Sequence, residues 1–390
     1  MKNEPIISLQ PAVIEWARKS IGISVEEVAH KIKRPVKEVR AWELGDSYPT
    51  YSQLEKLAYK VFKRPLAIFF LPEPPNETPP SKEFRTLPSS DLLTLQSDTH
   101  VQIRKAHAYQ LTLKDVFIGR NPSQKCIWRE LSLDVQQPIE PQATLVRELL
   151  NISLQCQIEW GNDETALKQW RKSIENLGIF VFKSSFKQKE ISGFCLSDPE
   201  FPLIYLNNST TKTRQIFSLL HELSHLLLSV NGISKINESY IDRLPHHEKK
   251  IEQFCNKIAS EILIPSIDFR NQTEGLANTI ESSSDDVFVR LASRYGVSRE
   301  AVLRRFFDNG KVSQEFYEQK ARFWSGQKKN VSGGDWYASQ NAYLSGKFAQ
   351  EVVSQHYRKQ LTVEQASDFL GINGKNFYAL EQRILEGAAA

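Results

Sequence analysis

The segment from His221 to His225 reads His-Glu-Leu-Ser-His, and its spacing predicts a metal centre. Residues four apart lie one turn above each other on a helix, so both imidazoles can bind one divalent ion from the same face. Glu222 would then lie beside that ion, where its carboxylate can accept a proton from the water that attacks a peptide carbonyl. The pattern therefore predicts zinc-assisted hydrolysis, with His221 and His225 as ligands and Glu222 as the general base.

The residues around this motif predict a buried amphipathic helix. Apolar side chains recur at three- and four-residue spacing: Ile216, Leu219, Leu220, Leu223, Leu226 and Leu227. Thr210 or Thr211 could cap the start of the helix. The alternative to a metal site is a pair of histidines packed in the core.

A catalytic zinc needs a third protein ligand and an open position for water. The candidates downstream of the motif are Glu238, Asp242, His246, His247 and Glu252. Residues 247–263 read as a helix that ends before Pro265, and Glu252 lies at the edge of its apolar face. Its neighbours at positions 255, 256 and 259 are small, so its carboxylate has room to turn inward. A solvated surface glutamate remains the alternative.

Three segments between Ser192 and Pro265 resemble the ImmA/IrrE family of metallo-endopeptidases. They are SGFCLSDPEFPLIYLNN, RQIFSLLHELSHLLL and IEQFCNKIASEILIP. The resemblance implies one Zn²⁺ per chain, held by His221, His225 and Glu252, with Glu222 as general base. It also implies that the strand containing Cys195 runs near the metal. A thiolate there could occupy the fourth zinc position as a redox switch, although an ordinary buried cysteine is the alternative.

The first 70 residues predict a second unit built from short helices. The segment SVEEVAHKIKRPVKEVRAWELGDSYPTYSQLEKLAYKVF resembles the XRE/Cro-type helix-turn-helix domain. Its recognition helix would run over about 35–43, with Lys37, Glu38 and Arg40 toward the major groove and Lys33 and Arg34 near phosphates. The net charge of the whole chain is only +4, so the same fold could instead pair with a protein.

Composition and length predict a multi-domain protein. The 390 residues exceed one typical core, and 40% hydrophobic with 25% charged residues is ordinary for globular chains. No secretion signal or long apolar run is legible at the N-terminus, which predicts a cytoplasmic protein without a membrane role. The four cysteines show no CxxC pairs, which disfavours a disulfide framework and a zinc knuckle.

The expected fold class is mainly α with an α+β zincin-like peptidase core, and we expect five segments. A helix-turn-helix domain (1–70) is followed by a proline-rich linker (71–89) and a zinc peptidase domain with a helical lead-in (90–310). A second linker (311–335) then precedes a helical C-terminal domain (336–390). In the peptidase core, a helix over 163–177 should precede strands in GIFVFKSS, SGFCL and PLIYLN.

These patterns together predict a zinc endopeptidase that also binds double-stranded DNA, with a homodimer as a further possibility. The family resemblance implies that its substrate is a helix-turn-helix repressor, cleaved to release stress, defence or mobile-element genes. The alternative is a transcription regulator or antitoxin whose metal site is structural or sensory and which cuts no peptide bond.

Overall fold

A computed structural model of the chain describes residues 4–84, 86–276, 280–326 and 342–389. These residues form two compact units. Unit 1 contains the chain up to Lys105 together with Phe186–Gln188, and unit 2 contains 106–185 and everything from Lys189 onward. Helix α7 (Ser97–Val116) contributes residues to both units. No helix in the described ranges combines the length and the apolarity that a membrane span requires.

Unit 1 is helical, which agrees with the expected N-terminal fold. Its elements before α7 are α1 (Pro11–Lys19), α2 (Val25–Ile32), α3 (Val36–Leu44), α4 (Tyr51–Glu55), η1 (Lys56–Phe62), η2 (Leu66–Phe70), α5 (Pro80–Glu83) and α6 (Ser89–Leu93). Apolar residues from α1 to η2 form one core around the fully buried Trp42 and Phe62. The short helix α5 lies inside the segment 71–89 that we expected to be a linker.

The sequence explains the geometry of the α2–α3 pair. Ser24 and Glu27 form a capping box that fixes the start of α2, and Lys33 ends α2 in the left-handed conformation. Trp42 is buried, and Glu43 accepts two hydrogen bonds from Arg18 of α1, at 2.7 and 2.9 Å. Gly45 supplies the positive φ of 82° that ends α3.

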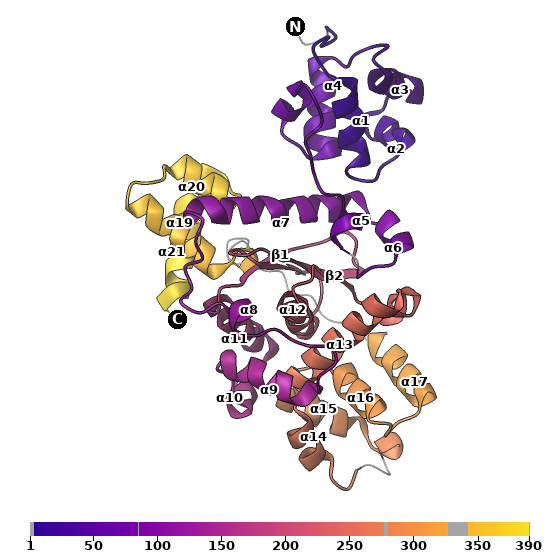
Figure 1. Cartoon of the computed structure of the whole chain (residues 1–390), viewed down its shortest axis with the longest axis vertical. Coiled ribbons are helices and arrows are strands. Elements are labelled where there is room, and N and C mark those ends of the chain that lie inside the picture. The colour runs from indigo at the N-terminus through magenta and orange to yellow at the C-terminus, as the bar shows by residue number, and fades with distance from the viewer. Residues whose placement is uncertain (1–3, 85, 277–279, 327–341, 390) are drawn as a thin grey trace. The chain divides into compact units, whose positions relative to one another are not determined.

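Unit 2 combines helices with one small sheet, as Figure 1 shows. Before the sheet lie α8 (Ile127–Glu130), α9 (Ile139–Leu149), α10 (Leu154–Glu159) and α11 (Asp163–Asn176). After it come α12 (Lys212–Leu227), η3 (Glu238–Arg243), α13 (His246–Leu263), α14 (Ser266–Thr273), η4 (Ile280–Ser282), α15 (Asp285–Tyr295), α16 (Arg299–Asp308), α17 (Gln314–Ser325), α19 (Gly346–Tyr357), α20 (Val363–Leu370), η5 (Gly374–Asn376) and α21 (Phe377–Ala389). The fold is therefore mainly α with an α+β core, as expected.

The sheet has the strand order β1-β3-β2-β4. Its strands are β1 (Phe180–Ser184), β2 (Ile191–Leu196), β3 (Leu203–Asn207) and β4 (Ile233–Lys235). β1 pairs parallel with β3, and the other pairs are antiparallel. The first three strands match the expected segments. The fourth, β4, was not expected, because its three residues carry too short a pattern to be recognised.

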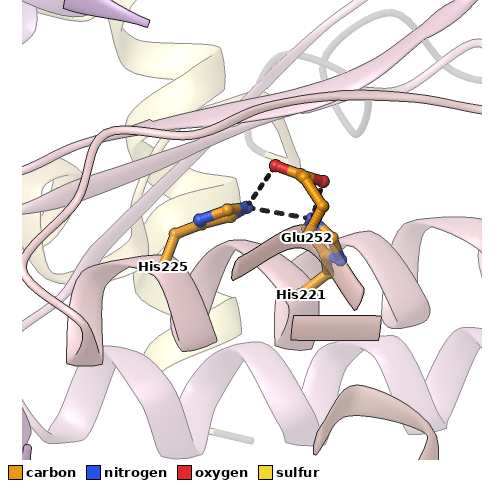
Figure 2. A group of neighbouring side chains, drawn as sticks. All are labelled: His221, His225 and Glu252. Carbon is orange, nitrogen blue, oxygen red and sulfur yellow. Dashed lines mark hydrogen bonds and ion pairs between the residues drawn. The ribbon is translucent and has the colours of Figure 1, made fainter. Parts of the chain in front are cut away.

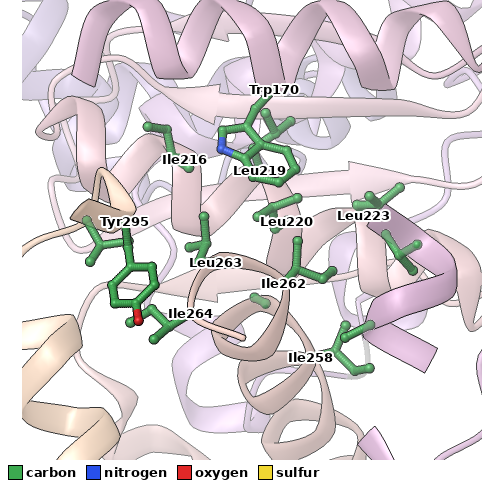
Figure 3. Close-up of a cluster of buried hydrophobic side chains, with 14 of the residues drawn as sticks. Trp170, Ile216, Leu219, Leu220, Leu223, Ile258, Ile262, Leu263, Ile264 and Tyr295 are labelled. Atoms are coloured by element: carbon green, nitrogen blue, oxygen red, sulfur yellow. The ribbon is translucent and has the colours of Figure 1, made fainter. Parts of the chain in front are cut away.

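The core of unit 2 surrounds α12 and α13. Figure 3 shows side chains of both helices packed against Trp170 of α11 and Tyr295 of α15. On the opposite face of the sheet, the ring of Phe182 of β1 stacks on the ring of Tyr109 of α7, with 4.0 Å between the ring centroids. The Phe182 ring also meets that of Phe348 of α19 edge-on, with 5.7 Å between the centroids. The C-terminal helices therefore share the compact unit of the sheet. The core around Trp170 and Tyr295 holds α12 and α13 side by side.

Helix α17 lies within the segment 311–335 that we expected to be a linker. Its Trp324 is only 8% exposed, contacts Phe288 and donates a hydrogen bond to Asp285 at 2.9 Å. Phe316 and Tyr317 of the same helix also pack against the core of unit 2. Residues 327–335 of the expected linker lie outside the described residues.

Candidate metal centre

The candidate site lies where α12 and α13 face each other in unit 2. Thr211 caps α12 by accepting a hydrogen bond from the Arg214 amide, so the helix begins at Lys212, shortly after β3 ends at Asn207. The apolar spacing of α12 turns its motif toward the sheet and α13. His221 is 3% exposed, while Glu222, His225 and Glu252 are 0% exposed.

The structure brings His221, His225 and Glu252 together, as Figure 2 shows. Their ligand atoms all lie within 4.8 Å of one another. The two Nε2 atoms are 3.1 Å apart, and the Glu252 carboxylate approaches them at 3.4 Å (His221) and 3.2 Å (His225). Two imidazoles and one carboxylate are the donor set of a catalytic zinc site, so these residues fit a metal ion.

Glu222 also points into this region from α12. Its Oε1 accepts a hydrogen bond from the Ser234 hydroxyl of β4. Its Oε2 is buried and has no hydrogen-bond partner among the described residues. Glu222 therefore has one oxygen fixed and one available, which suits a proton acceptor.

The electrostatics of the site come from charges buried together. Burial by itself would raise the pKa of Glu252, but the charge of His225 and the hydrogen bonds with both imidazoles hold it well below its usual range. Burial lowers the pKa values of His221 and His225, yet the Glu252 carboxylate reverses this and raises both above their usual value. A carboxylate that is ionised in a dry interior needs a nearby cation.

Gly232 allows the chain to pass close to the site. A Cβ atom at this position would lie 2.4 Å from Cδ2 of His225, so any other residue here would have to displace the imidazole ring. The Gly232 carbonyl accepts a hydrogen bond from the Cys195 amide at 2.9 Å, which anchors the start of β4 against β2. This glycine therefore confines the His225 ring, and the sequence reading did not identify it.

The other candidates for a third ligand do not join the group. Asp242 pairs with Lys249 at 2.8 Å, and Glu238 lies 3.7 Å from Arg304. His246 and His247 are exposed at the start of α13. Among the described acidic and histidine side chains, Glu252 alone completes the set with His221 and His225.

Cys195 lies on β2 and is fully buried. Its Sγ accepts a hydrogen bond from the Gly232 amide at 3.3 Å, and it is not part of the three-residue ligand group. Burial, and then the nearby Glu222, raises the pKa of the Cys195 thiol well above its usual value. The expected redox switch requires a thiolate, which this environment disfavours, and it stays a prediction.

The residues predicted to meet DNA lie on or near α3. Lys33, Arg34, Lys37 and Arg40 are exposed, and Glu38 is half-buried. Two of the cations have acidic neighbours, since Arg40 contacts Glu26 at 2.8 Å and Arg34 lies 4.0 Å from Glu38. The side chain of Glu38 accepts a hydrogen bond from Gln53 at 3.0 Å, so it is turned toward α4.

Comparison with known proteins bears on the region that holds the metal centre. Residues 174–307 match the family Peptidase_M78, described as the IrrE N-terminal-like domain. This match supports an ImmA/IrrE-type metallopeptidase domain over these residues, which make up about a third of the chain. The radiation response metalloprotease IrrE of Deinococcus deserti is 39% identical over 72 residues, which cover 18% of this chain and 25% of that protein. The ImmA/IrrE-type domain contains α12, β4 and α13, and thus every residue of the candidate site.

The sequence missed two hydroxyl groups at this centre. Ser234 donates to Glu222, and Tyr240 of η3 donates to Oε2 of Glu252 at 2.7 Å. Both lie in residues 233–243, where the sequence shows neither helical nor strand periodicity. The sequence could have pointed to them only through their position between the two helices that carry the candidate ligands.

Proposed function

We propose that this chain is a zinc-dependent endopeptidase. The observation that carries the proposal is the convergence of His221, His225 and Glu252 on one buried point, with Glu222 beside them in the ImmA/IrrE-type domain. A buried, unpartnered atom supports the fit, because Oε2 of Glu222 has no hydrogen-bond partner among the described residues. Such an atom suits a site that is completed by an ion and a substrate.

The three ligand side chains would hold the ion, which supplies a Lewis acid that polarises the peptide carbonyl and makes water more acidic. Glu222 would accept the proton of the attacking water on its unpartnered oxygen and pass it to the leaving amine. Ser234 would hold the other oxygen of Glu222 in place. The dry surroundings would strengthen each of these interactions.

The test is the substitution Glu222→Gln in the full chain. It preserves shape and leaves His221, His225 and Glu252 intact, so the zinc content of the purified protein should not change. Cleavage of a co-expressed helix-turn-helix repressor that the wild-type chain cuts should fall by a factor of about 100 or more. Unchanged cleavage would remove Glu222 from the role of general base.

One further outcome separates the proposal from its alternative. A wild-type chain that binds zinc, leaves its partner uncut and represses genes equally well with Glu222→Gln would be a non-proteolytic regulator or antitoxin. Its metal site would then be structural or sensory. A repressor as substrate, with the release of stress, defence or mobile-element genes, is part of this proposal and rests on the family resemblance.

We also propose that unit 1 binds double-stranded DNA through α3. The support is its exposed face, which carries Lys37 and Arg40 next to Lys33 and Arg34 at the end of α2. Binding to a mixed-sequence duplex should weaken with salt, and Lys37→Ala should reduce the salt slope by about one. The control is Lys172→Ala on α11. Absence of salt-dependent binding to any duplex would favour a protein partner for this unit.

A further inference from the structure

The segment from β4 to η3 contacts both carboxylates of the candidate site through hydroxyl groups. Ser234 donates to Glu222, and six residues later Tyr240 donates to Glu252. Tyr240 is 2% exposed and Ser234 is 3% exposed, so both hydrogen bonds lie in the protein interior. A hydrogen bond in such surroundings fixes a side chain more firmly than one at the surface.

Several contacts within unit 2 hold this segment in place. The Ile236 amide donates to the Glu190 carbonyl at 2.8 Å, and Arg214 of α12 donates to the Lys235 carbonyl at 2.9 Å. Asn237 caps η3 through the Ser239 amide at 2.9 Å. The Tyr240 hydroxyl therefore has a defined position relative to α12 and α13.

The histidines themselves lack the orienting contacts that metal ligands usually have. Metal-binding imidazoles commonly donate their second ring nitrogen to a carboxylate or a carbonyl. Here Nδ1 of His221 and Nδ1 of His225 are buried without a partner among the described residues. The only hydroxyl in the described part of the chain that donates to one of the three ligand side chains is that of Tyr240.

We propose that Tyr240 is a positioning residue that orients the Glu252 carboxylate for metal binding. Its hydroxyl engages Oε2, which leaves Oε1 facing His225 at 3.2 Å. Without the hydroxyl, the carboxylate could rotate and would have to be ordered when the ion binds. This inference rests on the proposed function, since it assigns a role toward the ion that the same three residues would hold.

The chain offers a matched control for this hydrogen bond. Tyr295 of α15 is 1% exposed and donates to Oδ2 of Asp268 at 2.7 Å, the same distance and the same chemistry. Asp268 instead pairs with Arg294 at 2.8 Å and is not one of the three ligand residues.

The experiment measures zinc affinity of the full chain by competition with a chromogenic chelator, together with the visible absorption of the Co²⁺-loaded protein. Tyr240→Phe should weaken zinc affinity by about 10- to 100-fold and change the Co²⁺ spectrum. Tyr295→Phe should stay within about twofold of wild type. Urea unfolding of the metal-free proteins shows how much each variant loses in folding alone.

The possible results are decisive in each direction. Equal zinc affinity and an equal Co²⁺ spectrum for Tyr240→Phe and wild type would overturn the positioning role while leaving the proposed peptidase intact. Equal losses of affinity in Tyr240→Phe and Tyr295→Phe would overturn it as well, because they would reflect general loosening. A wild-type chain that binds neither Zn²⁺ nor Co²⁺ would instead refute the proposed function itself.

Discussion

Helix α13 buries two glutamates, and their surroundings differ. Glu261 is 6% exposed and pairs with the guanidinium of Arg305 from α16. It also accepts hydrogen bonds from the amide and the hydroxyl of Ser266, both at 2.7 Å. Glu252, nine residues earlier on the same helix, is 0% exposed and meets two imidazoles and a phenol.

The difference separates a structural carboxylate from one that fits a ligand role. Glu261 has a permanent cation, because arginine stays charged at any relevant pH. Glu252 has only titratable neighbours, so the protein itself supplies no permanent positive charge to balance it. A buried carboxylate balanced only by imidazoles loses that balance whenever they are neutral, and a bound cation would supply the missing charge.

The largest test of this comparison exchanges each glutamate for glutamine. Glu252→Gln should remove measurable zinc binding, because only two imidazoles would remain, whereas Glu261→Gln should keep it. Zinc at about 1,000 times its Kd should stabilise the wild-type chain and Glu261→Gln by about 4 kcal/mol and leave Glu252→Gln unaffected. Zinc content after dialysis and unfolding with and without zinc provide the measurements. Strong zinc binding by Glu252→Gln would erase the distinction.

The second test concerns folding. Glu261→Gln leaves the buried Arg305 without its anion and should lower the free energy of unfolding by about 3 to 5 kcal/mol. The double variant Glu261→Leu with Arg305→Leu should recover most of that loss, since apolar side chains can replace a buried ion pair. Urea unfolding of the metal-free proteins measures both. If the double variant is as unstable as the single one, Glu261 has a role beyond pairing with Arg305.

The sequence predicted much of this site because its information is local. The spacing of His221 and His225 on an apolar helix indicated a common face, and the small neighbours of Glu252 indicated an inward carboxylate. The structure places the ligand atoms of these three residues within 4.8 Å of one another. The helix expected over 163–177 corresponds to α11, and the helix expected over 247–263 corresponds to α13.

The remainder depends on contacts between distant segments. Glu252 and Glu261 lie in similar sequence surroundings, and what distinguishes them is Arg305, which follows Glu261 by 44 residues. Tyr240 and Ser234 gain their roles only when β4 pairs with β2. Such pairings have no local signature, so neither the hydroxyl contacts nor the fourth strand could be predicted from the pattern.

A third test uses Lys183 of β1, a buried cation that mirrors Glu252. It is 6% exposed, and its ammonium group forms no ion pair with any described residue. Burial, followed by the charges of Arg171 and Lys212, lowers the pKa of Lys183 to about 7. The unfolded chain keeps this proton up to about pH 10.5, so the stability of the wild type should rise between pH 7 and 10.5.

Lys183→Met should therefore stabilise the protein by about 2 to 4 kcal/mol at pH 7. The gain should shrink as the pH rises and vanish near pH 10.5, while the exposed Lys172→Met on α11 should show no such trend. Urea unfolding at a series of pH values checks this. A gain that is independent of pH would mean that lost hydrophobic packing, not charge burial, limits the wild type at this position.

The smallest effect should come from Gly232, which confines His225. In Gly232→Ala the new methyl group must displace the imidazole, because its Cβ would lie 2.4 Å from Cδ2. We expect a loss of about 1 to 3 kcal/mol in the free energy of unfolding, together with weaker zinc binding. Gly326→Ala is the control, since its Cβ would meet its nearest neighbours at 3.6 Å or more. Zinc affinity separates displacement of His225 from a general loss of stability, because overpacking elsewhere in unit 2 would lower stability without moving a ligand. Unaltered zinc affinity in Gly232→Ala would show that His225 can shift without leaving the site, so that Gly232 would not be needed to hold this ligand.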